Sequence, residues 1–307
     1  MIQSDVGKGG PDEDTAHEDT AHEDTAGAEP GSGPALRPQS LMLNFLGNFV
    51  LGSDLCVYSG SIIDVLAHTG VGERATRSTL SRMVERGLLR RRRAGRRMYF
   101  GLTDRATAIL EDGKQRLLAR DAVNKDWDGT WTLLAFSLPE AEQRRRHDLR
   151  SRLTWAGFAP LIGGLWIAPG AADVTRLRED TELASHLRVF RSTADPATDT
   201  DRMIHDTWDL DTPAAGYRDF RLRWSAFADG LDGTIPGADA DAIALQLRLL
   251  TEWLLVIRAD PYLPALHLPA DWPAAAAQDV FRRAEARMDP VALASAQRLL
   301  ETMPLRD

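Results

Sequence analysis

A dense group of arginines is the part of the sequence with the most distinctive chemistry. Six of them fall within one short segment, at Arg90, Arg91, Arg92, Arg93, Arg96 and Arg97. Like charges at this density repel one another unless an anionic partner offsets the repulsion. Guanidinium groups bind phosphates and the acceptor edge of guanine, so we expect this segment to bind a nucleic acid.

A second group of polar residues lies just before these arginines and shares one side of a predicted helix. At about 100° per residue, Thr76, Leu80 and Met83 fall on one side of residues 73–86. The opposite side carries Arg74, Arg77, Ser78, Ser81 and Arg82. Arginines and small hydroxyls suit the major groove of DNA, whereas a solvated charged face is the other interpretation of this helix alone. The adjoining arginine group favours DNA.

The charge of the chain is unevenly distributed. Its formal net charge is −8, but residues 1–39 contain nine acidic residues and only two basic ones. Residues 70–120 contain fourteen lysines and arginines against five acidic residues. The basic excess therefore coincides with the two groups described above, as expected for a surface that binds a polyanion.

Three helices and a hairpin would hold these two groups in place. Apolar periodicity predicts helices over residues 40–50, 61–68 and 73–86. Residues 88–102 are predicted to form a β-hairpin, because Gly95 suits the positive φ of a short turn. A helix-turn-helix followed by such a hairpin is the layout of a winged helix. A winged helix that binds protein, or that serves only as structure, is the alternative.

The pattern changes twice after a linking helix, for which Thr103 is the predicted N-cap. Strand and helix patterns follow one another as strand, helix, strand pair, helix and strand, at residues 131–136, 140–155, 158–167, 174–183 and 187–190. This is the ferredoxin-like order. From residue 198 the apolar pattern is helical to the end, and Asp289-Pro290 has the signature of the start of the last helix.

These patterns predict an α+β protein of four segments. The segments are a disordered acidic tail (1–39), a winged-helix DNA-binding domain with its linking helix (40–122), a ferredoxin-like domain (123–197) and a helical C-terminal domain (198–307). The tail repeats Glu-Asp-Thr-Ala-His and has no large apolar side chain between Val6 and Leu36 to offset the entropy of folding. Metal binding by His17 and His22 is a minor alternative for this tail.

Several classes of function lack their sequence signals. No apolar run approaches the ~18 residues of a membrane span, no secretory signal is present, and the single Cys56 cannot form an internal disulfide. We therefore expect a cytoplasmic protein with no membrane partner. Metalloprotease, nucleophile-elbow and phosphate-loop motifs are also absent. We expect no metal, no cofactor and no enzymatic activity, although a Ser/His/Asp site built from distant residues stays open.

The sequence resembles the PaaX-type repressors of bacterial phenylacetic acid catabolism from about residue 40 to its end. Examples are Gly-Val-Gly-Glu-Arg at residue 70, Gly-Arg-Arg-Met-Tyr-Phe-Gly-Leu-Thr at residue 95 and Gly-Gly-Leu-Trp-Ile at residue 163. The segments that carry the resemblance are residues 70–82, 86–89, 95–103, 127–131, 163–167, 260–264 and 268–273. They come from all three predicted folded domains, in the order found in the family.

The resemblance implies a homodimer that binds a palindromic operator and is released by an aryl-CoA thioester such as phenylacetyl-CoA. It also implies a middle domain similar to the Cas2 nucleases, whose first strand ends in a metal-binding acid. Here that strand ends in Phe136-Ser137-Leu138-Pro139, with Glu140 placed at the start of the next helix. A metal-dependent nuclease targeted by a winged helix is therefore the less favoured alternative. A scaffold that binds protein through residues 198–307, and a regulator answering another ligand, stay open.

One group of residues in the C-terminal segment could hold an anionic aryl thioester. Arg218, Arg221 and Arg223 alternate with aromatic residues, among them Trp224. We assign these four to the effector site. The alternative is ordinary helix packing, in which the arginine stems cover apolar surface and their charged ends reach solvent.

Overall fold

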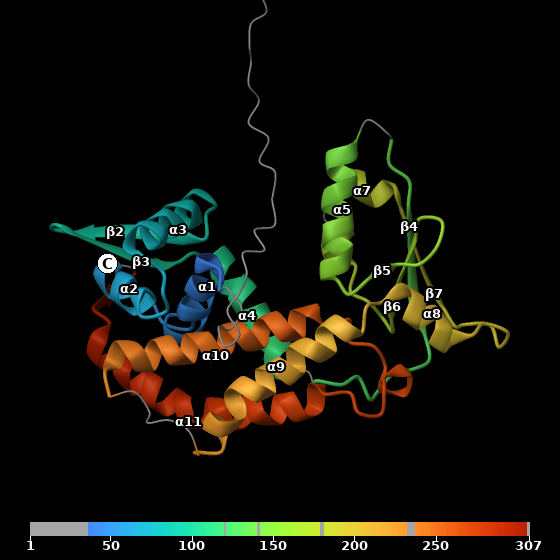
Figure 1. Ribbon diagram of the computed structural model, residues 1–307. Coiled ribbons are helices and arrows are strands. Elements are labelled where there is room, and N and C mark those ends of the chain that lie inside the picture. Colours follow the sequence, from blue (N-terminus) through green and yellow to red (C-terminus); the bar gives the residue numbers. More distant parts are fainter. Residues whose placement is uncertain (1–35, 120, 140–141, 179–180, 232–236, 306–307) are drawn as a thin grey trace, which may run out of the picture. The chain divides into compact units, whose positions relative to one another are not determined.

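The computed structural model describes residues 36–119, 121–139, 142–178, 181–231 and 237–305 (Figure 1). The acidic repeats of the predicted tail, with His17 and His22, lie outside the described residues. The first helix, α1 (Pro38–Phe49), starts two residues before the predicted boundary at residue 40. Proline suits the first turn of a helix because its φ is already helical and its missing N–H has no partner to lose there.

Three helices form the core beneath the arginine-rich segment. These are α1, α2 (Ser59–Ala67) and α3 (Glu73–Glu85), close to the predicted positions. Phe45, Ile62 and Leu80, one from each helix, are buried in a single cluster. Within each helix the buried apolar residues recur every three to four positions, and this spacing gives the helix the apolar side that packs inward.

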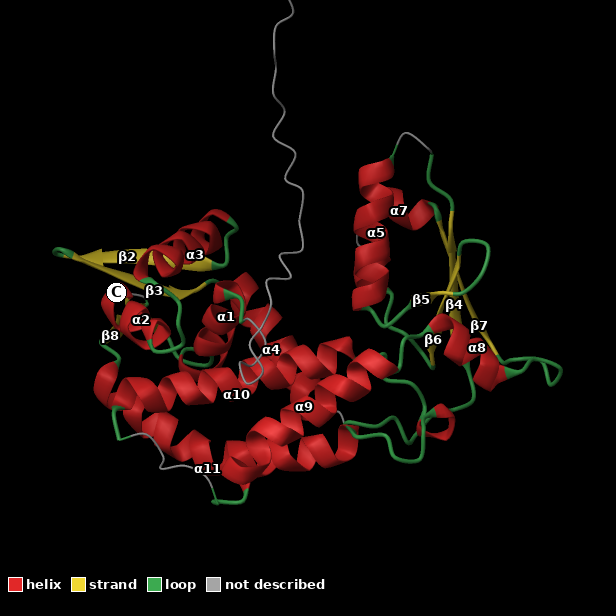
Figure 2. Cartoon of the chain, viewed as in Figure 1, coloured by secondary structure: helices red, strands yellow, loops and turns green. Residues whose placement is uncertain are grey.

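An antiparallel sheet adjoins these helices, with strand order β2-β3-β1-β8. The predicted hairpin is confirmed as β2 (Leu89–Ala94) and β3 (Arg97–Leu102), with Gly95 in the turn at φ 59°. Figure 2 shows the tip of this hairpin extending past α2 and α3. The other two strands, β1 (Leu55–Tyr58) and β8 (Thr302–Pro304), were not predicted. The helical pattern expected up to the C-terminus is therefore wrong for residues 302–304, which take their hydrogen bonds from β1.

Helices from distant parts of the sequence share this core. The helix α4 (Asp104–Ala119) leads the chain away from the hairpin. Its predicted N-cap, Thr103, is confirmed, because Ala106 N donates to Thr103 Oγ1 at 3.2 Å. Ile243 and Leu247 of α10 (Asp239–Ala259) return to the same apolar cluster as α1 to α3. The apolar face of α10 thus contributes to the core on which the hairpin rests.

The middle of the chain has the predicted strand and helix order around a second antiparallel sheet. Its elements are β4 (Trp131–Phe136), α5 (Gln143–Trp155), β5 (Ala159–Pro160), β6 (Leu165–Pro169), α6 (Thr175–Arg178), α7 (Thr181–Ser185) and β7 (Leu187–Ser192). The strand order is β5-β6-β4-β7. Leu149 and Leu153 of α5 pack with Leu134 and Trp166 on one face of the sheet. The second predicted helix is present as two short helices, α6 and α7.

Helices dominate the rest of the chain. They are α8 (Thr200–Thr207), α9 (Asp211–Ala228), α10, a 3₁₀ turn at Ala265–His267 and α11 (Ala274–Leu299). α9, α10 and α11 run alongside one another around Phe220, Trp253 and Phe281 (Figure 1). None of the described helices is both long enough and apolar enough to cross a membrane.

The predicted start of a last helix at Asp289-Pro290 is wrong. Pro290 lies inside α11, which begins at Ala274 and continues to Leu299. A proline in a helix interior costs about 3 kcal/mol or more, so the helix continues only because its packing outweighs that cost. Met288 and Ala292, on either side of Pro290, are both fully buried. Local preference was thus overridden by tertiary packing.

Candidate nucleic-acid interface

The outward face of α3 has the composition predicted from the sequence. Arg74, Arg77, Ser78, Ser81 and Arg82 are all exposed. Thr76, Leu80 and Met83 on the opposite side are buried, with exposures of 0%, 2% and 1%. The helix begins after Gly72 and is followed by Gly87 at φ 67°, a conformation that glycine adopts readily at a helix end. One side of α3 is therefore fixed by packing and the other is open.

Most hydrogen-bonding groups on this outward face are free to bind a ligand. Arg74, Ser78 and Ser81 have no side-chain partner among the described residues. Arg77 pairs with Glu73 at 2.7 Å, and both side chains are about 60% exposed. An ion pair this exposed contributes little to stability, so Arg77 can exchange Glu73 for an external acceptor at small cost.

The six hairpin arginines divide into two groups. Strand alternation places Arg90, Arg92 and Arg97 on one side of the hairpin. Arg92 Nη1 donates to the Pro304 carbonyl at 2.7 Å, and Arg97 pairs with Glu301. Arg90 pairs weakly with the exposed Asp104 at 3.4 Å. These three arginines already contact other parts of the protein, so they are not equivalent to the remaining three.

The remaining three arginines are exposed at the tip and along the other side of the hairpin. Arg91 and Arg96 have no side-chain partner among the described residues. Among the described residues, Arg93 donates only to the carbonyl of Gly95 in its own turn, at 2.9 Å. Arg91, Arg93 and Arg96, which we call the free wing arginines, are therefore the hairpin residues best placed to bind phosphates.

Glu301 is the centre of a polar cluster that sequence reasoning missed. Its carboxylate accepts hydrogen bonds from the Tyr99 hydroxyl and the Arg97 guanidinium. Both bonds lower the pKa of Glu301 below its ordinary value, so the carboxylate is ionised at neutral pH. The Arg97 guanidinium also lies over the ring of Tyr58, 5.2 Å from its centroid. No spacing or motif in the sequence connects residue 301 with residue 97.

The four residues assigned to an effector site differ in their burial and in their partners. Trp224 is buried, and its Nε1 donates to Glu252 Oε2 at 2.9 Å. Arg223 Nε donates to the same oxygen at 3.0 Å, while Glu252 itself is 1% exposed. Arg218 and Arg221 are exposed, and Arg221 has no side-chain partner among the described residues. Trp224 and Arg223 thus belong to the packing of α9 against α10, and Arg221 is the available cation.

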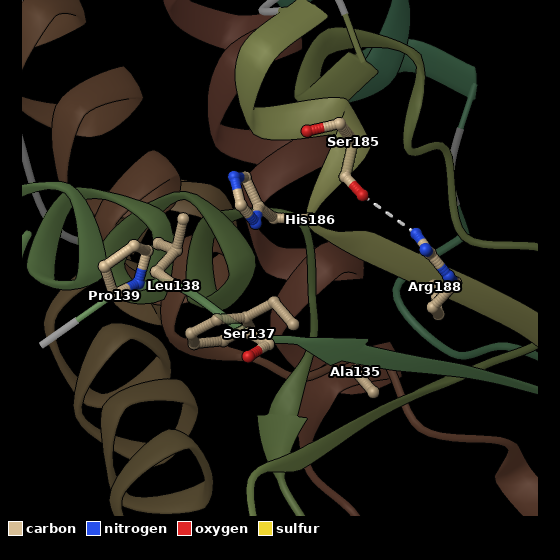
Figure 3. Close-up of a pocket in the computed structure, with 8 residues that line it drawn as sticks. Ala135, Ser137, Leu138, Pro139, Ser185, His186 and Arg188 are labelled. Atoms are coloured by element: carbon tan, nitrogen blue, oxygen red, sulfur yellow. Dashed lines mark hydrogen bonds between the residues drawn. The ribbon is translucent and has the colours of Figure 1, made fainter.

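A cavity of about 550 Å³ lies at the end of β4 (Figure 3). Ser137, His186 and Arg188 are among the residues that line it, and none of the described lining residues is acidic. Arg188 Nη1 donates to the Ser185 carbonyl at 2.9 Å. Glu140, considered above as a metal ligand, lies outside the described residues. Within the described part of the chain, no three His, Cys, Asp or Glu side chains come together to hold a metal ion.

Three family models match the chain in succession. Residues 37–106 match the model described as PaaX-like protein, and residues 124–204 match the PaaX protein central Cas2-like domain. Residues 208–298 match the PaaX-like protein C-terminal domain. The matches follow the order of the helices and hairpin, the second sheet and the C-terminal helices.

Two individual proteins are also similar. The transcriptional repressor PaaX of Escherichia coli strain K12 is 28% identical over 248 residues, which cover 78% of this chain and 76% of the repressor. An uncharacterized protein from Mycobacterium tuberculosis has a solved structure that matches with a TM-score of 0.53 and 24% identity. That match covers 85% of this chain and 99% of the other, and it concerns the fold alone.

Proposed function

Because the chain belongs to the PaaX family, we propose that it is a DNA-binding transcriptional repressor whose N-terminal part acts as a winged helix. The observation that carries the proposal is the outward face of α3, with its exposed arginines and serines next to an arginine-rich hairpin. The named relative is a transcriptional repressor, which supports a regulator rather than an enzyme. A repressor works where the DNA is, so we place the protein in the cytoplasm.

The two parts of the surface would read DNA differently. Arg74, Arg77, Ser78, Ser81 and Arg82 would enter the major groove, where arginine can bond both acceptors of guanine. The free wing arginines would bind phosphates or the minor groove beside it. Phosphate contacts position a protein on DNA, and base contacts give it sequence preference.

A homodimer would place two copies of this surface on a palindromic operator. Two-fold symmetry of the protein then matches two-fold symmetry of the DNA, with half-sites separated by whole helical turns. Within each protomer we propose the division into residues 40–122, 123–197 and 198–307, with DNA bound by the first. The tail at residues 1–39 has no assigned role.

The ligand we propose is an aryl-CoA thioester, with phenylacetyl-CoA as the first compound to test. A ligand releases a repressor only if it binds the DNA-free conformation more tightly than the DNA-bound one, because equal affinity shifts no equilibrium. Its phosphates require cations, and Arg221 is exposed and unpaired within the described residues. We propose that Arg218, Arg221, Arg223 and Trp224 form this effector site, with Arg221 as its phosphate contact and with Arg223 and Trp224 held in place by Glu252.

Fluorescence anisotropy of labelled DNA tests the function directly. The full-length protein should bind a fragment of its own promoter tightly and a shuffled fragment weakly, with affinity that falls as salt rises. Phenylacetyl-CoA should weaken binding to the promoter fragment, whereas free coenzyme A should not. If the protein binds the promoter fragment selectively and phenylacetyl-CoA does not weaken that binding, the proposed repressor function stands and this ligand is rejected. Equal binding to both fragments would reject the proposed function.

Two single substitutions test where the thioester binds. Arg221→Ala should raise the thioester concentration needed for half-release by about tenfold or more, because a charge-assisted hydrogen bond to phosphate is lost. Arg188→Ala, which removes a cation from the cavity at the end of β4, should leave that concentration unchanged. If Arg188→Ala raises the thioester concentration for half-release more than Arg221→Ala does, the effector binds in the cavity and not at Arg221. The measurement is release of DNA at fixed protein concentration.

A further inference from the structure

We propose that Glu301 and the C-terminal strand β8 position the arginine hairpin, so that the last residues of the chain determine how well it binds DNA. The inference rests on the proposed DNA-binding function. Glu301 would be a positioning residue, since it contacts the hairpin and not the DNA.

The backbone of the C-terminal segment is held against the sheet at both of its ends. Between them, Cys56 of β1 pairs with Met303 of β8 in antiparallel register. Before β8, Tyr58 N donates to the Glu301 carbonyl at 2.8 Å. After it, Leu305 N donates to the Asp54 carbonyl at 2.7 Å. These bonds fix residues 301–305 as the outer strand of the sheet that contains the hairpin.

Side chains then connect this segment to both strands of the hairpin. Glu301 accepts from Tyr99 and Arg97 of β3, and the Pro304 carbonyl accepts from Arg92 of β2. A β-carbon at Gly101 would lie 2.7 Å from both Cys56 Sγ and Leu305 Cδ1. Glycine at this position therefore allows the C-terminal residues to close over the sheet. Together these contacts restrain both strands of the hairpin, from Gly101 near its base to Arg97 beside its turn.

The segment also connects the hairpin to the C-terminal helices. Residue 301 lies two positions after Leu299, the last residue of α11, which packs against α9 and α10. Ser61 Oγ of α2 accepts from Glu301 N at 3.1 Å, at the junction between α11 and β8. A shift of α11 would therefore move Glu301, which is the hydrogen-bond partner of both Arg97 and Tyr99.

Positioning and simple electrostatics predict opposite results when the charge of Glu301 is removed. A carboxylate near a DNA-binding surface repels phosphates, so its loss alone would strengthen binding and would free Arg97 for a further phosphate contact. If Glu301 instead holds the hairpin in place, its loss lets the hairpin move and weakens binding. The sign of the change separates the two explanations.

The experiment compares full-length wild type, Glu301→Gln and Glu85→Gln on promoter and shuffled DNA over a range of salt concentrations. Glu85 lies exposed on α3 with no side-chain partner in the described part of the chain, so its variant loses the same charge without loosening the hairpin. Glu301→Gln should weaken binding to both DNAs by about fivefold to tenfold and reduce the salt dependence. Glu85→Gln should bind as wild type or more tightly.

Binding by Glu301→Gln that equals or exceeds that of wild type would overturn the inference. Tyr99→Phe provides a second test, since it keeps the ring but loses the hydroxyl that bonds Glu301; it should weaken binding by about twofold to threefold. This variant decides the matter if Glu301→Gln does not fold, as judged by thermal unfolding. If wild type shows no preference for the promoter fragment, that result rejects only the proposed function. Binding of the variants to shuffled DNA still tests whether Glu301 positions the hairpin.

Discussion

Replacing Arg91 and Arg96 together with alanine should weaken binding to every DNA sequence by roughly 10- to 50-fold near physiological salt. Both side chains are exposed and have no protein partner in the described structure, so binding DNA costs them no existing contact. Each phosphate contact contributes about 0.9 to the slope of log affinity against log salt concentration. The double variant should therefore lower the magnitude of that slope by about two.

The matched control for this prediction removes two exposed arginines from other elements. Arg202 of α8 and Arg282 of α11 have side chains 79% and 59% exposed, and their joint replacement lowers the net charge by the same amount. The control variant should keep nearly the wild-type slope. An equal fall in both double variants would mean that overall charge, and not the hairpin, governs binding.

Arg77→Ala should instead lower affinity for the operator alone, by about 5- to 150-fold. A bidentate contact between arginine and guanine contributes roughly 1–3 kcal/mol of discrimination between base pairs. Arg77 lies on the outward face of α3 and gives up only its exposed pair with Glu73. Affinity for shuffled DNA should change little, and the salt slope should stay close to that of wild type.

The measurement for Arg77 is competition between the promoter fragment and variants of it with single base-pair changes. One base pair should lose its influence in Arg77→Ala while the others keep theirs. Arg202→Ala, a single charge loss on α8, should preserve the preference at every position. Uniform losses on promoter and shuffled DNA would show that Arg77 contacts phosphate and not a base.

The elements that carry the candidate interface could be predicted because their signals are local. The outward face of α3 follows from the spacing of Thr76, Leu80 and Met83, and all three are buried as expected. The turn at Gly95 follows from its position between two strand patterns. In both places the residues within one element contain the information that determines it.

The parts that could not be predicted depend on contacts between distant residues. β8 has only three residues and forms because β1 offers it unpaired backbone groups. Pro290 stays helical because Met288 and Ala292 are buried on either side of it. The division of the hairpin arginines likewise depends on Glu301 and Pro304, which no local pattern connects to residues 92 and 97.

The position of β8 has a consequence for how the protein is made. Arg92 and its partner Pro304 are 212 residues apart, so a ribosome makes the hairpin long before the strand that completes its sheet. At about 5–20 residues per second, the hairpin waits roughly 10–40 s for that strand. A nascent chain that has not yet reached residue 301 would thus lack the finished sheet. Newly made protein would acquire its full affinity for DNA only once residues 301–305 have been made and can dock on β1.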